Sequence, residues 1–200
     1  MSSTDDDAWP CEDDGDFLTG RLLIAMPGIE DPRFERVVIL MCAHSPEHAM
    51  GIALNRPLEG LSLSELLDRL GVDARIELPE RAVLSGGPIE RERGFVLHTD
   101  DYAAPQSTLS VADGVALTAT REVLEAIADP VQSPRCAVLA LGCAGWSPGQ
   151  LEREIKDNVW LTCEPDEALI FDADHDTKWE RALAKIGVSA SQLSMQSGRA

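Results

Sequence analysis

The chain has 200 residues, of which 44% are hydrophobic, so it can close one sizeable core and is not a disordered protein. It contains no stretch of membrane-spanning length, and its N-terminus has neither the basic nor the apolar part of a secretion signal, so we expect a cytoplasmic protein. A net charge of −18 argues against direct binding to nucleic acid or to anionic membranes, because it repels phosphate groups.

The N-terminal segment, residues 1–16, is an acidic leader without a basic residue. We expect it to be disordered, either as a solvated segment or, alternatively, as a docking segment for another molecule. The sequence predicts one domain over residues 17–187 and a small, polar C-terminal tail over residues 188–200. The acidic residues of the leader are Asp5, Asp6, Asp7, Glu12, Asp13, Asp14 and Asp16.

Short apolar runs, broken by glycine, proline and aspartate, predict β-strands throughout the domain. Asp113 and Gly114 separate two of these runs and are typical of a hairpin turn. Several predicted strands follow one another without a helix between them, so a purely alternating parallel sheet does not fit and we predict a mixed α+β fold. The predicted strands are residues 21–26, 37–41, 51–54, 82–84, 94–98, 108–111, 114–118, 136–141, 160–162 and 168–171.

Four helices are predicted from the residues at their ends. The first begins at Ser62, which can form a capping box with Glu65, and it ends at Gly71. The second covers residues 120–128 and the fourth covers residues 177–186, each with apolar side chains at helical spacing.

The third helix is expected to begin at Ser147. Pro148 would occupy the first helical position, and Gln150 would complete a capping box with Ser147. Trp146 is spaced to pack against Leu151 and so to fix the angle at which the chain enters the helix.

The segment 142–149 is a candidate site because we expect it to be a tight loop between a strand and a helix N-terminus. Backbone amides at such a position stabilise anions or a reactive thiolate. The alternative is purely structural, with glycine allowing the turn, Ser147 capping the helix, Trp146 packing and Cys143 acting as a buried apolar residue. The candidate residues are Gly142, Cys143, Ala144, Gly145, Trp146 and Ser147.

The five cysteines are odd in number and widely spaced, without a C-x-x-C pair, so we expect reduced and mostly buried thiols. A nucleophilic Cys143 would need an imidazole, and His44, His98 and His175 are the possible partners. His44 and His48 also complete an H-x-x-E-H pattern, but Pro46 lies inside it in a short connection between two strands. We therefore predict a polar hairpin loop there, and we expect neither a metal nor a cofactor.

A second candidate site is one that we expect to bind an anion. Arg56 follows a predicted strand and offers a planar cationic donor, with Asn55 before it, while Ser85, Gly86 and Gly87 form a turn that can expose backbone amides. Together the two segments could line an anion pocket. The alternative is an arginine paired with one of the many carboxylates, beside an ordinary turn.

Several segments in register resemble the YqgE/AlgH family of bacterial proteins, over about residues 17–198. The chain departs from the family pattern at Ala43, where the family usually has glutamate, and in its acidic leader. The segments that carry the resemblance are residues 20–28, 31–34, 50–57, 85–88, 93–98, 144–152, 154–155 and 158–160.

The resemblance implies a bifurcated mixed β-sheet folded into a pseudo-barrel, with helices packed outside. It also implies a suggested role in transcriptional regulation, although neither a helix-turn-helix nor a basic stripe is visible in the sequence. Our first hypothesis is therefore a non-enzymatic binding or regulatory protein whose partner is another protein or a small anionic ligand. The alternative is an enzyme or a thiol-reactive sensor built on residues 142–149.

Overall fold

A computed structural model of the protein describes residues 17–196, with side chains as far as Leu193. The acidic leader predicted from the sequence lies outside these residues. Within them, no helix is both long enough and apolar enough to cross a lipid bilayer.

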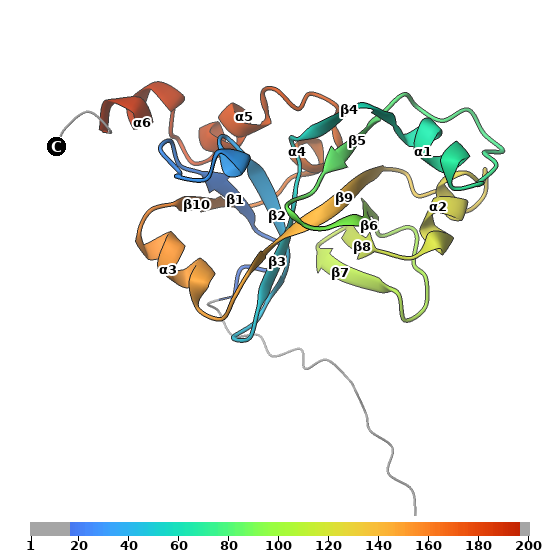
Figure 1. The fold of residues 1–200 in the computed structure, drawn as a ribbon, viewed down its shortest axis with the longest axis horizontal. Coiled ribbons are helices and arrows are strands. Elements are labelled where there is room, and N and C mark those ends of the chain that lie inside the picture. Colours follow the sequence, from blue (N-terminus) through green and yellow to red (C-terminus); the bar gives the residue numbers. More distant parts are fainter. Residues whose placement is uncertain (1–16, 197–200) are drawn as a thin grey trace, which may run out of the picture.

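The centre of the fold is a curled sheet of ten strands that forms a half-barrel (Figure 1). Its main path runs in the order β10-β1-β2-β3-β9-β6-β8-β7, and β4 and β5 branch from it at β9. The β5–β9 pair is parallel, whereas the other strand pairs are antiparallel, so the sheet is mixed and bifurcated as expected. The strands are β1 Leu22–Ala25, β2 Val38–His44, β3 Ala49–Ala53, β4 Pro57–Ser62, β5 Ala82–Ser85, β6 Ile89–Thr99, β7 Thr108–Ala112, β8 Val115–Thr118, β9 Ala137–Trp146 and β10 Trp160–Cys163.

Strand β9 connects the two parts of the sheet and crosses the middle of the molecule in Figure 1. Its first half pairs with β6 and β5, for example Leu139 with Val96, and its second half pairs with β3, for example Trp146 with Ala49. Gly142 stands between the two halves with a φ of 77°, a conformation that glycine adopts without strain.

The helices cover both faces of the sheet (Figure 1). The two nearest the β5–β6–β8 side are α1 and α2, while α3 and α5 lie on the side of β1, β2 and β10. The helical elements are a 3-10 turn, η1 Pro32–Phe34, and the helices α1 Leu63–Arg69, α2 Arg121–Ile127, α3 Gln150–Lys156, α4 Glu167–Phe171, α5 Lys178–Lys185 and α6 Ala190–Gln196.

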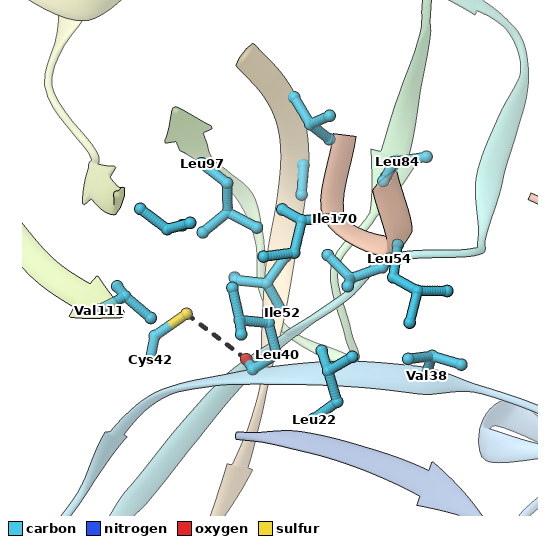
Figure 2. Close-up of a cluster of buried hydrophobic side chains, with 14 of the residues drawn as sticks. Leu22, Val38, Leu40, Cys42, Ile52, Leu54, Leu84, Leu97, Val111 and Ile170 are labelled. Carbon is cyan, nitrogen blue, oxygen red and sulfur yellow. Dashed lines mark hydrogen bonds between the residues drawn. The ribbon is translucent and has the colours of Figure 1, made fainter. Parts of the chain in front are cut away.

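Strands β1 and β2 bury both of their faces, which explains why their sequences are continuously apolar. Leu22 and Leu40 point into the inside of the curl, where they meet Leu97 of β6 and Ile170 of α4 (Figure 2). Leu23 faces the opposite way, into a second cluster that α3 closes. A third cluster joins β5, β6 and β9 to α1 and α2.

Most of the predicted elements are present. The capping box between Ser62 and Glu65 is formed. Asp113 and Gly114 form the turn of the β7–β8 hairpin. Residues 168–171 were predicted as a strand, and this is wrong, because the side chain of Asp166 accepts a hydrogen bond from the amide of Leu169 and begins α4 there. Strand β4 was not predicted, and both β6 and β9 are longer than expected.

The C-terminal segment, predicted as a polar tail, contains the helix α6 as far as the structure describes it. Val188, Ala190 and Leu193 pack against the cluster inside the curl. As far as its side chains are described, the few apolar residues of this segment therefore contact the core.

Candidate functional site

The segment 142–149 is not the loop that the sequence predicts. Strand β9 continues through Trp146, and α3 begins only at Gln150, after Gly149 with a φ of 71°. Pro148 is therefore in a turn before the helix. The side chain of Gln150 accepts from the amide of Ser147, which is half of the expected capping box.

Cys143 is consequently a strand residue rather than a residue at a helix N-terminus. Its side chain is 4% exposed, and burial raises the pKa of its thiol, with a further contribution from Glu90. Although the charge of Arg93 partly opposes them, these two effects disfavour a thiolate, and the buried sulfur lacks the accessible surroundings of a reactive cysteine.

The three candidate imidazoles are engaged elsewhere. His44 accepts the amide of Leu18 at Nδ1 and donates to Glu152 through Nε2, at 3.0 and 2.7 Å. The ring of His98 bonds Thr118 at 2.8 Å, and that of His175 lies 3.2 Å from a backbone carbonyl oxygen. Residues 45–48 form the connection between β2 and β3, as the hairpin prediction requires.

The second predicted site is different, because the structure brings its two segments together. Arg56, Ser85 and Gly87 line one cavity of about 290 Å³, with Arg33 and Arg91 beside them. We call this the arginine cavity. Its remaining lining residues are apolar: Pro32, Phe34, Val37, Ala53, Pro57 and Pro88.

Backbone pairing holds Arg56 and Ser85 next to each other. The amide of Ser85 donates to the carbonyl oxygen of Arg56 at 2.7 Å, where β4 and β5 begin their antiparallel pairing. The guanidinium of Arg56 donates to the carbonyl oxygen of Glu35, which anchors it at the cavity wall. Burial lowers the pKa of Arg56, although the charge of Glu35 partly opposes this, and the guanidinium remains a cation.

The glycines of this turn serve close packing rather than exposure of amides. A Cβ atom on Gly87 would lie 2.1 Å from the carbonyl carbon of Cys143, and one on Gly86 would lie 2.2 Å from the oxygen of Gly142. Gly86 donates its amide to Leu141 and accepts from Ala53 through its oxygen. Gly87 lines the cavity, whereas the backbone of Gly86 is hydrogen-bonded to residues of the sheet.

Asn55 is also structural. Its side-chain oxygen accepts from the amide of Val38 at 3.0 Å, and its nitrogen donates to the oxygen of Arg36 at 2.8 Å. These two bonds fix the segment before β2 and leave the Asn55 side chain outside the cavity lining. The anion hypothesis therefore keeps Arg56, Ser85 and Gly87 as lining residues.

Two arginines of the cavity were not selected from the sequence. Arg33 lies in η1 and is held by Asp31 through contacts of 2.6 and 3.0 Å, and this hydrogen bonding lowers the pKa of Asp31. Arg91 lies in the irregular part of β6, and within residues 17–196 its guanidinium has no protein partner. Arg33 belongs to one of the segments of the family resemblance, whereas the charged run around Arg91 gave no signal.

The arrangement is suited to binding an anion. The polar side chains of the lining are three guanidiniums and the hydroxyl of Ser85, which has no protein partner in the described part of the chain. Guanidiniums offer paired donors to carboxylate or phosphate, and a hydroxyl adds one more. The described lining contains no carboxylate, imidazole or thiol, so the cavity has donors for binding and no general base.

Comparison with known proteins adds the family. A family model described as AlgH-like matches residues 22–191. A protein of Caulobacter vibrioides named UPF0301 protein is 64% identical over 94% of this chain and 97% of its own length. A protein of the same name from a Methylobacterium strain is 53% identical over 92% of this chain and 90% of its own length.

Two solved structures resemble the fold. The solution structure of the AlgH protein from Pseudomonas aeruginosa has a TM-score of 0.72 and 39% sequence identity, and the match covers 94% of this chain and 99% of that one. A crystal structure of a Corynebacterium diphtheriae protein has a TM-score of 0.67 over 91% of this chain and 92% of that one. At 19% identity the second match supports the fold alone.

Proposed function

Since this chain belongs to the AlgH-like family, we propose a function from the geometry of its own arginine cavity: it is a non-enzymatic binding protein that holds a small oxyanion ligand there. The observation that carries this proposal is the convergence of three arginines from η1, the β3–β4 connection and β6. They gather in a protein whose net charge is −18, so the cavity attracts anions against the mean field of the molecule.

The proposal includes how the ligand is held. Arg33 and Arg56 are already fixed by Asp31 and by the oxygen of Glu35, so ordering them costs little on binding. Arg91 has no protein partner within the described residues and supplies an uncommitted pair of donors. Phe34 and the neighbouring prolines provide an apolar wall, which favours an oxyanion attached to an organic group over a bare ion.

Any role in gene regulation is, on this proposal, indirect. Direct contact with duplex DNA would place phosphates against a strongly acidic protein, and each phosphate contact requires a basic side chain. We propose instead that the ligand-bound protein acts on another protein, in the cytoplasm. Thiol chemistry at Cys143 receives less support, because its side chain is buried and its pKa is raised.

The test is calorimetric titration of the full-length protein with phenyl phosphate, using phenol as the uncharged comparison. Arg91→Gln and Arg56→Gln should each weaken phenyl phosphate binding roughly tenfold or more, because a hydrogen bond to a charged group contributes about 1.5–3 kcal/mol. Arg69→Gln is the matched control, since Arg69 is exposed on α1 outside the cavity. Equal affinity of the wild type, R91Q and R69Q proteins, or equal binding of phenol, would refute the proposal.

A further inference from the structure

A second cavity, of about 220 Å³, lies where α4 and the segment after it meet β5 and β9. We call it the α4 cavity. It is smaller than the pockets that hold drug-sized molecules, so its occupant has to be small. Its walls are mainly apolar and include Leu63, Ala82, Val138, Leu139, Phe171 and Ala173, and its polar lining residues are Glu80, Arg81, Asp172 and His175.

Arg81 lines this cavity and has a pair of donors that the described residues do not use. Its Nη1 atom donates to the carbonyl oxygens of Phe171 and Ala137, at 2.8 and 3.3 Å, and these two bonds fix the plane of the guanidinium. Within residues 17–196, Nε and Nη2 have no partner. The Nε–Nη2 edge of a guanidinium matches the two oxygens of a carboxylate, and here that edge is already oriented.

The carboxylate that lines the cavity does not cancel this charge. Asp172 is held by Arg181 through contacts of 2.6 and 3.0 Å, and its Oδ1 atom lies 3.7 Å from Nζ of the buried Lys178. Two cations therefore share this one carboxylate, and Arg81 adds a third positive charge. Glu80 is exposed to solvent, where its charge is well screened.

His175 adds an acceptor. Its Nδ1 atom lies 3.2 Å from the oxygen of Leu54, so Nδ1 carries the proton and Nε2 presents a lone pair. Burial lowers the pKa of His175, and the charge of Lys178 lowers it further, so the ring is neutral at physiological pH. Nε2 has no partner in the described part of the chain and can accept a hydrogen bond from a ligand.

We propose that the α4 cavity binds a small carboxylic acid with a short apolar body, whose carboxylate lies on the Nε–Nη2 edge of Arg81. The apolar body packs against Phe171 and Val138, and a hydroxyl beside the carboxylate donates to Nε2 of His175. An amino group at that position is disfavoured, because its charge would face the cations Arg81 and Lys178. The preferred class is therefore the small hydroxy acids. This site is separate from the arginine cavity and does not depend on the function proposed for it.

The experiment is an NMR titration of the full-length ¹⁵N-labelled protein with 2-hydroxyisovalerate, isovalerate and isovaleramide. We expect the hydroxy acid to bind most tightly and the uncharged amide at least tenfold more weakly than isovalerate. The shifted amides should cluster around residues 80–82, 137–139 and 171–175. Equal binding of acid and amide, equal binding of the two acids, or shifts elsewhere would overturn the proposal.

Two variants keep the test decisive if one of them folds poorly. Arg81→Gln removes the donor edge. Ala173 is an exposed residue of the cavity lining, and Ala173→Leu fills the cavity. Each variant should therefore bind the hydroxy acid at least tenfold more weakly. Arg69 and Arg91 lie outside this cavity, so Arg69→Gln and Arg91→Gln should leave the affinity for the hydroxy acid unchanged. Wild-type affinity in folded A173L and R81Q proteins would refute the site, whereas loss of phenyl phosphate binding in R91Q alone concerns only the arginine cavity.

Discussion

Lys178 is a cation that the fold buries completely, with 0% of its side chain exposed at the start of α5. Its Nζ atom is 3.4 Å from the oxygen of Ile170 and 3.7 Å from Asp172, so an ammonium with three donors has few and long contacts. Burial lowers the pKa of Lys178 from 10.5 to about 8, although the charge of Asp172 opposes the change. Keeping this lysine charged therefore costs stability at neutral pH.

This residue predicts a specific pH dependence of stability. Between pH 8 and 10.5 the unfolded chain binds more protons at Lys178 than the folded protein does, so the free energy of unfolding rises with pH in this window. The rise amounts to about 3 kcal/mol for the shift from 10.5 to about 8. Below pH 8 both states are protonated, and the cost is present in full.

Lys178→Met isolates this effect. Methionine fills a similar volume without a charge, and Asp172 keeps its bonds to Arg181, so K178M should be more stable than the wild type at pH 7 by up to about 3 kcal/mol. Urea unfolding at several pH values should show this advantage shrinking towards pH 10.5. Lys156→Met, at an exposed position, should show no such trend, and a constant difference for K178M would contradict the account.

The cysteines predict a distinct order of reactivity. Cys42, Cys143 and Cys163 are buried and burial raises the pKa of each thiol, whereas Cys136 is only half-buried, so its sulfur is more accessible to a reagent. Iodoacetamide should therefore label Cys136 faster than the three buried thiols in the folded protein. Labelling rates read site by site by mass spectrometry measure this, and labelling of Cys143 at the rate of Cys136 would revive the thiol-sensor hypothesis.

At the scale of elements, the turn after β5 crosses β9 at a distance that only glycine permits. Gly87 has a φ of 154°, and its Cβ would lie 2.1 Å from Cys143 and 2.3 Å from the nitrogen of Ala144. A Cβ atom on Gly142 of β9 would likewise lie only 2.6 Å from the carbonyl oxygen of Gly87. This contact holds one wall of the arginine cavity against the strand that joins both parts of the sheet.

Gly87→Ala should consequently destabilise the protein by more than about 2 kcal/mol, because backbone atoms of β9 have to move. Gly60→Ala is the matched control: Gly60 has a φ of 71° but nothing within 4 Å of its Cβ position, so only backbone strain of about 1 kcal/mol applies. Chemical unfolding of both variants gives the comparison. Similar losses in the two would show that β9 yields easily at the crossing.

Local signals predicted the elements that local chemistry decides. The capping box of Ser62 marks α1, and Asp113 with Gly114 marks the β7–β8 hairpin. The strand prediction for residues 168–171 was wrong because a short apolar run has no clear period, and the N-cap at Asp166 makes this run a helix. Strand β4 was not predicted because its sequence is polar and contains glycine. It becomes a strand by pairing with β5, which lies beyond α1 in the chain.

The site was predictable only in part for the same reason. Arg56 and the 85–88 turn could be selected by residue type, but their contact depends on the β4–β5 pairing and on β9. Arg91 enters the cavity through an irregular stretch of β6, between Ile89 and Gly94, that no local pattern marks. Cys143 was misplaced because an apolar strand followed by glycine was interpreted as a strand that ends there, whereas β9 bends at Gly142 and continues.

On the scale of the whole molecule, charge is distributed unevenly. The chain carries 35 acidic and 17 basic residues, and yet the arginine cavity and the α4 cavity are each lined by arginine. Excess negative charge destabilises the compact state through self-repulsion, whereas a bound anion at an arginine cluster stabilises the folded state only. Salt and a binding anion therefore act on stability by different routes.

These two routes predict how the unfolding midpoint depends on the anion. Sodium chloride should raise the midpoint by screening repulsion, and it should do so at least as much in the Arg56→Gln/Arg91→Gln double variant, which has two fewer positive charges, as in the wild type. At equal ionic strength, sulfate should stabilise the wild type more than the double variant. The difference approaches about 2.7 kcal/mol when the sulfate concentration is one hundred times its Kd.

The double variant is the necessary comparison, because sulfate also strengthens apolar burial in any protein, and this general effect is common to both chains. Thermal unfolding of each protein in matched chloride and sulfate series separates the two contributions. Should sulfate raise both midpoints equally, its effect would be the general one, and the arginine cavity would hold no inorganic oxyanion. An excess confined to the wild type would assign the added stability to the guanidiniums of Arg56 and Arg91.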